Sequence, residues 1–119
     1  MRRILIVDED VDMLSFLKSA LKKLHYNVIV TTVAQEVRDI LFFFEADLIF
    51  VGISRGKEDG KVLCGQLRSG TEYQHIPVVI MSEEDEVLAG YKKIGATGSL
   101  RRPFEVSEMV RAAQIYLSN

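Results

Sequence analysis

The sequence contains one cysteine, two prolines, no tryptophan and no long apolar run. A single cysteine, Cys64, excludes an internal disulfide and is typical of a reducing compartment, so we expect a cytoplasmic protein. No stretch approaches the roughly 18 apolar residues of a transmembrane helix, so no membrane partner is predicted. The net charge of −2 gives no electrostatic attraction to nucleic acid, so no direct nucleic-acid partner is expected either.

The apolar residues that are present suffice for one folded domain. Hydrophobic residues make up 48% of the 119 residues, which argues against a disordered chain and allows a real core. We therefore predict one domain over residues 1–119. The sequence leaves open whether this domain stands alone or is the first domain of a longer protein.

Apolar runs of strand length alternate with segments in which apolar residues recur every three or four positions, as on helices. The run Leu48–Val51 suits a central strand buried on both faces. Strands are predicted at 3–7, 27–31, 47–52, 76–82 and 99–101, and helices at 11–24, 32–44, 59–69, 84–94 and 105–118. This alternation predicts an α/β fold, a single (βα)5 doubly wound domain whose five-stranded parallel sheet carries helices on both faces.

Open parallel sheets bind ligands at the carboxyl ends of their strands, so the residues there are candidates for function. Asp8 and Glu9 follow the first predicted strand, and Gly52 ends the third. Ser82 ends the fourth strand, and Arg102 follows the fifth. Because these ends meet at one edge of the sheet, the five residues are expected to form one site.

Together with Asp59-Gly60 and Pro103-Phe104, the order and spacing of these residues resemble the receiver domain of bacterial response regulators, a flavodoxin-like signalling module. The similarity covers essentially the whole chain. It implies the strand order 2-1-3-4-5. It also implies two-component, or phosphorelay, signal transduction, in which an aspartate at the end of the third strand takes a phosphoryl group from a histidine kinase.

Carried over by this resemblance, Asp8 and Glu9 are the acids that help to hold Mg²⁺, and Ser54 supplies a backbone carbonyl to the same ion. Ser82 is the hydroxyl that binds a phosphoryl oxygen and takes part in switching. The Arg102-Pro103 peptide stands where the family often has a cis bond.

Three positions depart from the family. Gly52 stands where the acceptor aspartate is expected, Arg102 replaces a lysine, and Ser99 replaces a switching aromatic residue. Glycine offers no nucleophile, and with one carboxylate missing no cofactor is required and only weak Mg²⁺ binding is expected. Because arginine pairs with carboxylates through a planar fork, Arg102 is predicted to turn into the space at Gly52 and pair with Asp8 and Glu9.

These departures predict a pseudo-receiver, an atypical response-regulator receiver that acts as a phosphorylation-independent protein-interaction module and is not an enzyme. A receiver phosphorylated on another acceptor, near Asp8 or Ser54, is the alternative. A flavodoxin-fold ligand-binding protein is disfavoured, because the loop at residues 8–12 is acidic and would repel phosphate.

The resemblance further implies that partners bind through the fourth helix, the fifth strand and the fifth helix. Four cationic residues lie on those elements: Lys92, Lys93, Arg101 and Arg111. We expect the partner to be a histidine kinase, an output domain or a second copy of the chain, the last of which would give a homodimer.

Overall fold

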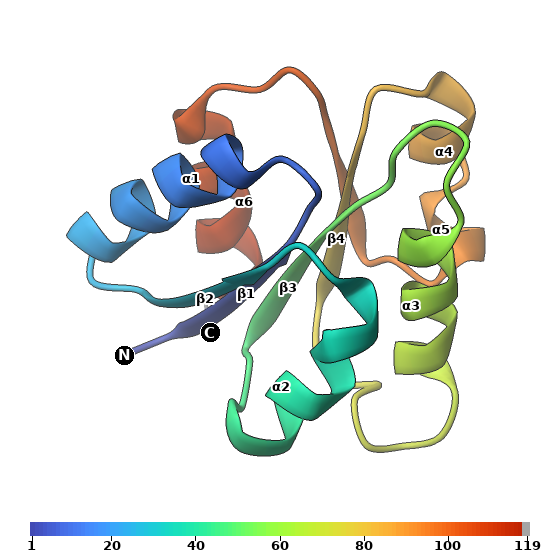
Figure 1. Ribbon diagram of the computed structural model, residues 1–119, viewed down its shortest axis with the longest axis horizontal. Coiled ribbons are helices and arrows are strands. Elements are labelled where there is room, and N and C mark those ends of the chain that lie inside the picture. The colour runs from blue at the N-terminus through green and yellow to red at the C-terminus, as the bar shows by residue number, and fades with distance from the viewer. Residues whose placement is uncertain (118–119) are drawn as a thin grey trace.

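The computed structural model describes residues 1–117, in which five strands form one parallel sheet (Figure 1). In chain order the strands are β1 (Arg3–Val7), β2 (Asn27–Thr31), β3 (Leu48–Gly52), β4 (Val78–Ser82) and β5 (Gly98–Arg101). Across the sheet they run β2-β1-β3-β4-β5, and every neighbouring pair is parallel. The predicted fold class and strand order are confirmed.

Helices cover both faces of this sheet. They are α1 (Val11–Lys23), α2 (Val37–Phe43), α3 (Asp59–Arg68), α4 (Asp85–Ala89), α5 (Tyr91–Ile94) and α6 (Val106–Leu117), with a short 3-10 turn, η1 (Ala34–Glu36). One face carries α1 and α6, and the other carries α2 to α5 (Figure 1). None of the helices in the described part of the chain has the length and apolar character needed to cross a bilayer. The predicted end of the last helix, residue 118, lies outside the described residues.

The central strand β3 joins the two halves of the core. Ile49 and Val51 belong to the core beneath α2 to α5, whereas Leu48 and Phe50 belong to the core beneath α1 and α6. All four side chains are fully buried. This is the pattern expected of a parallel strand covered on both faces, and it holds Gly52 rigidly at the strand's carboxyl end.

The single helix predicted at 84–94 is wrong, because this segment forms two short helices, α4 and α5. Gly90 separates them, and glycine is the residue least suited, after proline, to a helix interior. Its amide still donates to the carbonyl of Glu86, and its carbonyl accepts from the amide of Lys93. The break therefore keeps the backbone hydrogen-bonded while changing the direction of the chain.

The helix predicted at 32–44 begins later than expected, at Val37. Thr31 does not cap it, because its hydroxyl accepts from the amide of Val33 and donates to the carboxylate of Glu36. These bonds stabilise a turn ahead of η1. By contrast, a side chain caps the start of α1, since Asp10 accepts from the amide of Met13 at 3.0 Å.

Arg68, the last residue of α3, connects three segments at the amino end of the sheet. Its guanidinium donates hydrogen bonds of 2.7 to 3.3 Å to five residues, Tyr73, Gln74, Ile76, Gly95 and Thr97. Four of these acceptors are backbone carbonyls and one is a hydroxyl. A single side chain thus satisfies loop carbonyls that have no strand partner.

Replacing Arg68 by methionine should lower the free energy of unfolding by about 2–4 kcal/mol, because the apolar stem is kept while charge-assisted hydrogen bonds are lost. Urea denaturation followed by circular dichroism measures this change. Arg38→Met on the exposed surface of α2 is the matched control and should stay within about 0.5 kcal/mol of the native chain. Equal stability of the two variants would contradict the role given to Arg68.

Candidate functional site

The strand ends bring the predicted site residues to one edge of the sheet. Asp8 follows β1, Gly52 ends β3, Ser82 ends β4 and Arg102 follows β5. The Arg102 amide donates to the Ser82 carbonyl at 2.9 Å, which extends the β4–β5 pairing by one residue and fixes where the arginine side chain begins. The peptide between Arg102 and Pro103 is cis, as the resemblance implied.

Arg102 and Asp8 form a buried ion pair beside Gly52. Arg102 Nη1 donates to Asp8 Oδ1 at 3.2 Å, and Nη2 lies 2.5 Å from Oδ2. The second contact is one of charge only, since Oδ2 has no partner with hydrogen-bond geometry. Nη2 also donates to the Met81 carbonyl at 3.3 Å. The predicted contact between Arg102 and Asp8 is confirmed.

The pair lies almost entirely out of water. The Asp8 side chain is 1% exposed and that of Arg102 is 20% exposed. Asp8 Oδ1 additionally accepts from the amide of Asp10 at 3.0 Å, which orients the carboxylate toward the arginine. A charge buried to this degree requires such a partner, because an unpaired carboxylate would strongly destabilise the fold.

This ion pair fills the space that a side chain at Gly52 would need. A Cβ placed on Gly52 would overlap Asp8 Oδ2 and would lie 2.5 Å from Arg102 Nη2. The obstacle is therefore two charged groups that hold each other in place. No acceptor side chain fits at this strand end while the pair is closed.

Glu9 does not join Arg102, so this part of the prediction is wrong. Its carboxylate lies 2.7 Å from Lys57 Nζ instead. Hydrogen bonds from Lys57 and then Ser54 hold the pKa of Glu9 below its usual value, and the carboxylate in turn raises the pKa of Lys57. Lys57 was missed from the sequence, where its only signal was a cation in the loop after β3.

The donor set at this edge does not fit Mg²⁺. Asp8 is bound to Arg102 and Glu9 to Lys57, and the Ser54 carbonyl expected at the metal accepts from the Lys57 amide at 3.1 Å. The cavity beside these groups measures only about 50 Å³. Among residues 1–117, no three His, Cys, Asp or Glu side chains are placed to hold a metal ion. Weak Mg²⁺ binding at Asp8 and Glu9 stays a prediction, and the geometry opposes it.

The two predicted switch positions have different environments. Ser82 is fully buried, and its hydroxyl accepts from the Glu84 amide at 3.1 Å, which supports the turn into α4. Ser99 is exposed on β5. The functional roles given to both residues stay predictions, and the observed contacts of Ser82 are structural.

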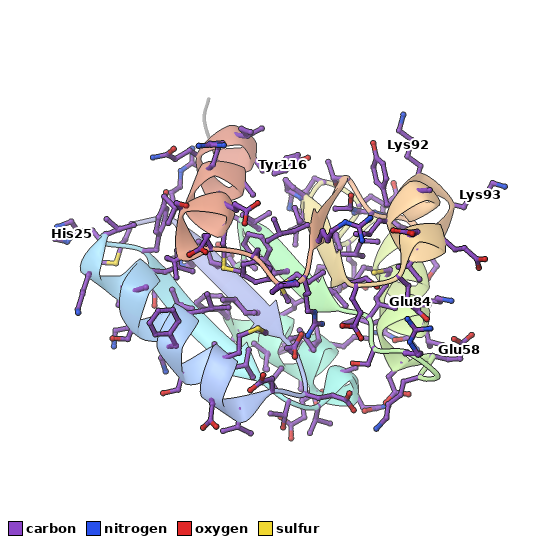
Figure 2. The ribbon with its side chains drawn as sticks, turned by 90° about the horizontal axis from the view of Figure 1, so that it is seen from above. His25, Glu58, Glu84, Lys92, Lys93 and Tyr116 are labelled. Atoms are coloured by element: carbon purple, nitrogen blue, oxygen red, sulfur yellow. The ribbon has the colours of Figure 1, made fainter. Side chains whose placement is uncertain are left out.

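The predicted partner surface is exposed and carries charges of both signs, because the acidic run at residues 83–86 lies beside its four cations. Lys92 and Lys93 project outward from α5, away from the body of the molecule (Figure 2). Arg101 is paired with Asp85 at 2.6 Å, and Arg111 is exposed on α6. Exposed pairs of this kind contribute little stability, so these side chains are available to a partner.

Adding a side chain at position 52 should destabilise the protein. Gly52→Ala is expected to lower the free energy of unfolding by about 1–3 kcal/mol, because the new methyl group overlaps the Asp8–Arg102 pair. Urea denaturation tests this. Gly65→Ala is the control, since a Cβ there meets nothing within 4 Å, and on α3 it should stabilise by about 0.5–1 kcal/mol. An unchanged free energy of unfolding in Gly52→Ala would show that the ion pair moves aside at little cost.

The single cysteine should be unreactive in the folded protein. Cys64 is fully buried on α3, and burial raises the pKa of its thiol from 9.0 to about 11. Since only the thiolate attacks, this shift alone lowers the reactive fraction about a hundredfold near neutral pH. Labelling by a disulfide reagent should therefore be slow in buffer and fast in urea. Fast labelling of the native protein would contradict the burial of Cys64.

Comparison with known families gives one match that covers most of the chain. The family model described as response regulator receiver domain matches residues 4–114. The heme response regulator HssR of Staphylococcus saprophyticus is 28% identical over 109 residues, which are 89% of this chain and 47% of that protein. The nisin biosynthesis regulatory protein NisR of Lactococcus lactis is 29% identical over 108 residues, with 91% and 47% of the two chains covered.

Solved structures show the same fold. A two-component response regulator from Clostridium difficile superposes with a TM-score of 0.85 at 26% identity and covers 98% of this chain and 96% of that one. The chain spans about half the length of the curated relatives it matches.

Proposed function

The chain belongs to the response regulator receiver domain family, and on that premise we propose that it is a receiver that works in two-component signalling without being phosphorylated. The observation that carries the proposal is the closed Asp8–Arg102 ion pair over Gly52. The family's phosphoryl transfer requires a nucleophile in line with the leaving group. At the corresponding strand end this chain has no side chain and no room for one.

The charge at this edge is already balanced without metal or phosphate. Arg102 neutralises Asp8, and Lys57 neutralises Glu9. The Arg102 side chain also donates to the Met81 carbonyl, and the Lys57 amide donates to the Ser54 carbonyl. These bonds favour one arrangement of the residues at this edge. These contacts support a module whose surface is ready for a partner before any signal arrives.

The partner surface follows from the exposed cations on α5, β5 and α6. A histidine kinase, an output domain or a second copy of the chain would bind there through acidic groups opposite Lys92, Lys93 and Arg111. In this proposal the protein is cytoplasmic, needs no cofactor and catalyses no reaction. Phosphorylation of Asp8 is disfavoured, because the Asp8 carboxylate is buried and paired with Arg102.

The test is an NMR titration with Mg²⁺ and then beryllofluoride, a mimic of the phosphoryl group that binds an acceptor aspartate. Amide signals near Ser54, Ser82 and Arg102 should not shift in the native chain. The amide signals of Gly52→Asp should not shift either, because the Arg102 side chain still occupies the space beside residue 52. The double variant Gly52→Asp/Arg102→Lys should respond, since lysine releases the second contact of the fork.

Saturable shifts that the native chain shows on addition of beryllofluoride, beyond those caused by Mg²⁺ alone, would overturn the proposal, because they would require an acceptor other than residue 52. The matched control is Arg102→Lys without the aspartate, which removes the fork and supplies no nucleophile. A response of this single variant would show that the shifts report metal or fluoride binding alone. Incubation with acetyl phosphate followed by intact-mass measurement should give no adduct on the native chain.

A further inference from the structure

A wide cleft opens at the amino edge of the sheet, opposite the site described above. It measures about 670 Å³ and lies where the chain enters β1, β3 and β4. Its lining is rich in rings, contributed by Phe42, Phe44, Tyr73, His75 and Tyr116. Figure 1 shows the elements around it, with α2 and the loop after α3 at the lower end of the sheet, and Tyr116 is labelled in Figure 2.

Two phenylalanines of α2 point into water, and the first of them, Phe42, lines this cleft. Phe42 is 90% exposed and Phe43 is 72% exposed, whereas the next residue, Phe44, is buried at 6%. The apolar side of α2 is already supplied by Val37 and Leu41, so the exposed rings have no part in the core. Two adjacent exposed aromatic residues beside a ring-lined cleft differ from the scattered apolar side chains usual on a surface.

Charged side chains of both signs line the same cleft. One of them, Asp47, accepts from the amide of Arg3. Four further charged residues of the lining are Arg2, Arg3, Glu45 and Glu72. Within residues 1–117 none of these four side chains takes part in an ion pair. The cleft rim therefore carries unused charges that are complementary to one another.

We infer that this surface binds a second copy of the chain. A two-fold dimer needs one patch that complements itself, and this patch holds an exposed ring and a cleft, with cations and anions together. In such a pair Phe42 of each copy enters the cleft of the other, and the arginines of each copy face the glutamates of its mate. A partner other than a second copy would need only the ring or the cleft, and only the cations or the anions, so the presence of all four favours a second copy.

This dimer would leave the cationic surface on α5 and β5 free. Figure 1 shows α2 at the lower end of the molecule and α5 on the other side of α3, so one partner does not cover the other. The inference thus stands apart from the proposed function, and phosphoryl chemistry plays no part in its test.

Sedimentation over a concentration series tests the dimer on the whole chain. The native protein should associate reversibly, and Phe42→Ser should raise the dissociation constant at least about tenfold, as loss of a central aromatic contact does. Phe16→Ser is the matched control, because that ring is 62% exposed on α1, away from the cleft, and should leave association unchanged. Circular dichroism should show all three proteins equally folded.

Reversing the charges at the cleft gives a second, independent test of the dimer. The variant Arg2→Glu/Arg3→Glu should dissociate, and adding Glu45→Lys/Glu72→Lys to it should restore association, since the rim is again complementary to itself. A native chain that stays monomeric up to its solubility limit would overturn the inference. Dissociation by Phe16→Ser as strong as that by Phe42→Ser would also overturn it, because the interface would then lie on α1.

Discussion

The Asp8 carboxylate is almost completely withdrawn from water, and everything at the carboxyl edge of the sheet is arranged around its charge. Removing the partner of such a group typically costs about 3–5 kcal/mol, a large part of the stability of a small domain. Arg102 provides that partner and also bonds to the Met81 carbonyl. One side chain from the end of β5 therefore ties together the ends of β1 and β4.

Two glycines, Gly52 and Gly60, leave the space in which this strand end lies. On one side lie Asp8 and Arg102, and on the other lies the first turn of α3, where a Cβ on Gly60 would come within 2.6 Å of the Gly52 carbonyl. The strand end is thus enclosed by an ion pair and by a helix backbone. A side chain at this position would have to move charged groups that stabilise each other, so the missing acceptor and the arginine form one structural unit.

The sequence predicted the features that many residues indicate together and missed those that depend on a single residue. Apolar runs and helical spacing predicted all five strands. The resemblance, which put a glycine at the acceptor position and Arg102 at the lysine position, predicted the contact between Arg102 and Asp8. The break at Gly90 was missed, because apolar residues continue at helical spacing on both sides of it. The bonds of Arg68 and Lys57 were missed because each depends on where a long side chain turns within folded loops, which local sequence does not specify.

A phosphoryl group shifts a receiver between two states only by binding one of them more tightly than the other. Under the proposed function, a domain whose acidic groups are paired with its own cations lacks that ligand and, with it, the source of the shift. What can still distinguish conformations is a protein surface that contacts one of them better. A rigid, preformed surface lowers the entropy lost on association, so the Asp8–Arg102 pair would favour tight partner binding at the expense of switching. Under the proposed function, the contact that fills the space beside Gly52 also suits the domain to an interaction that is always available.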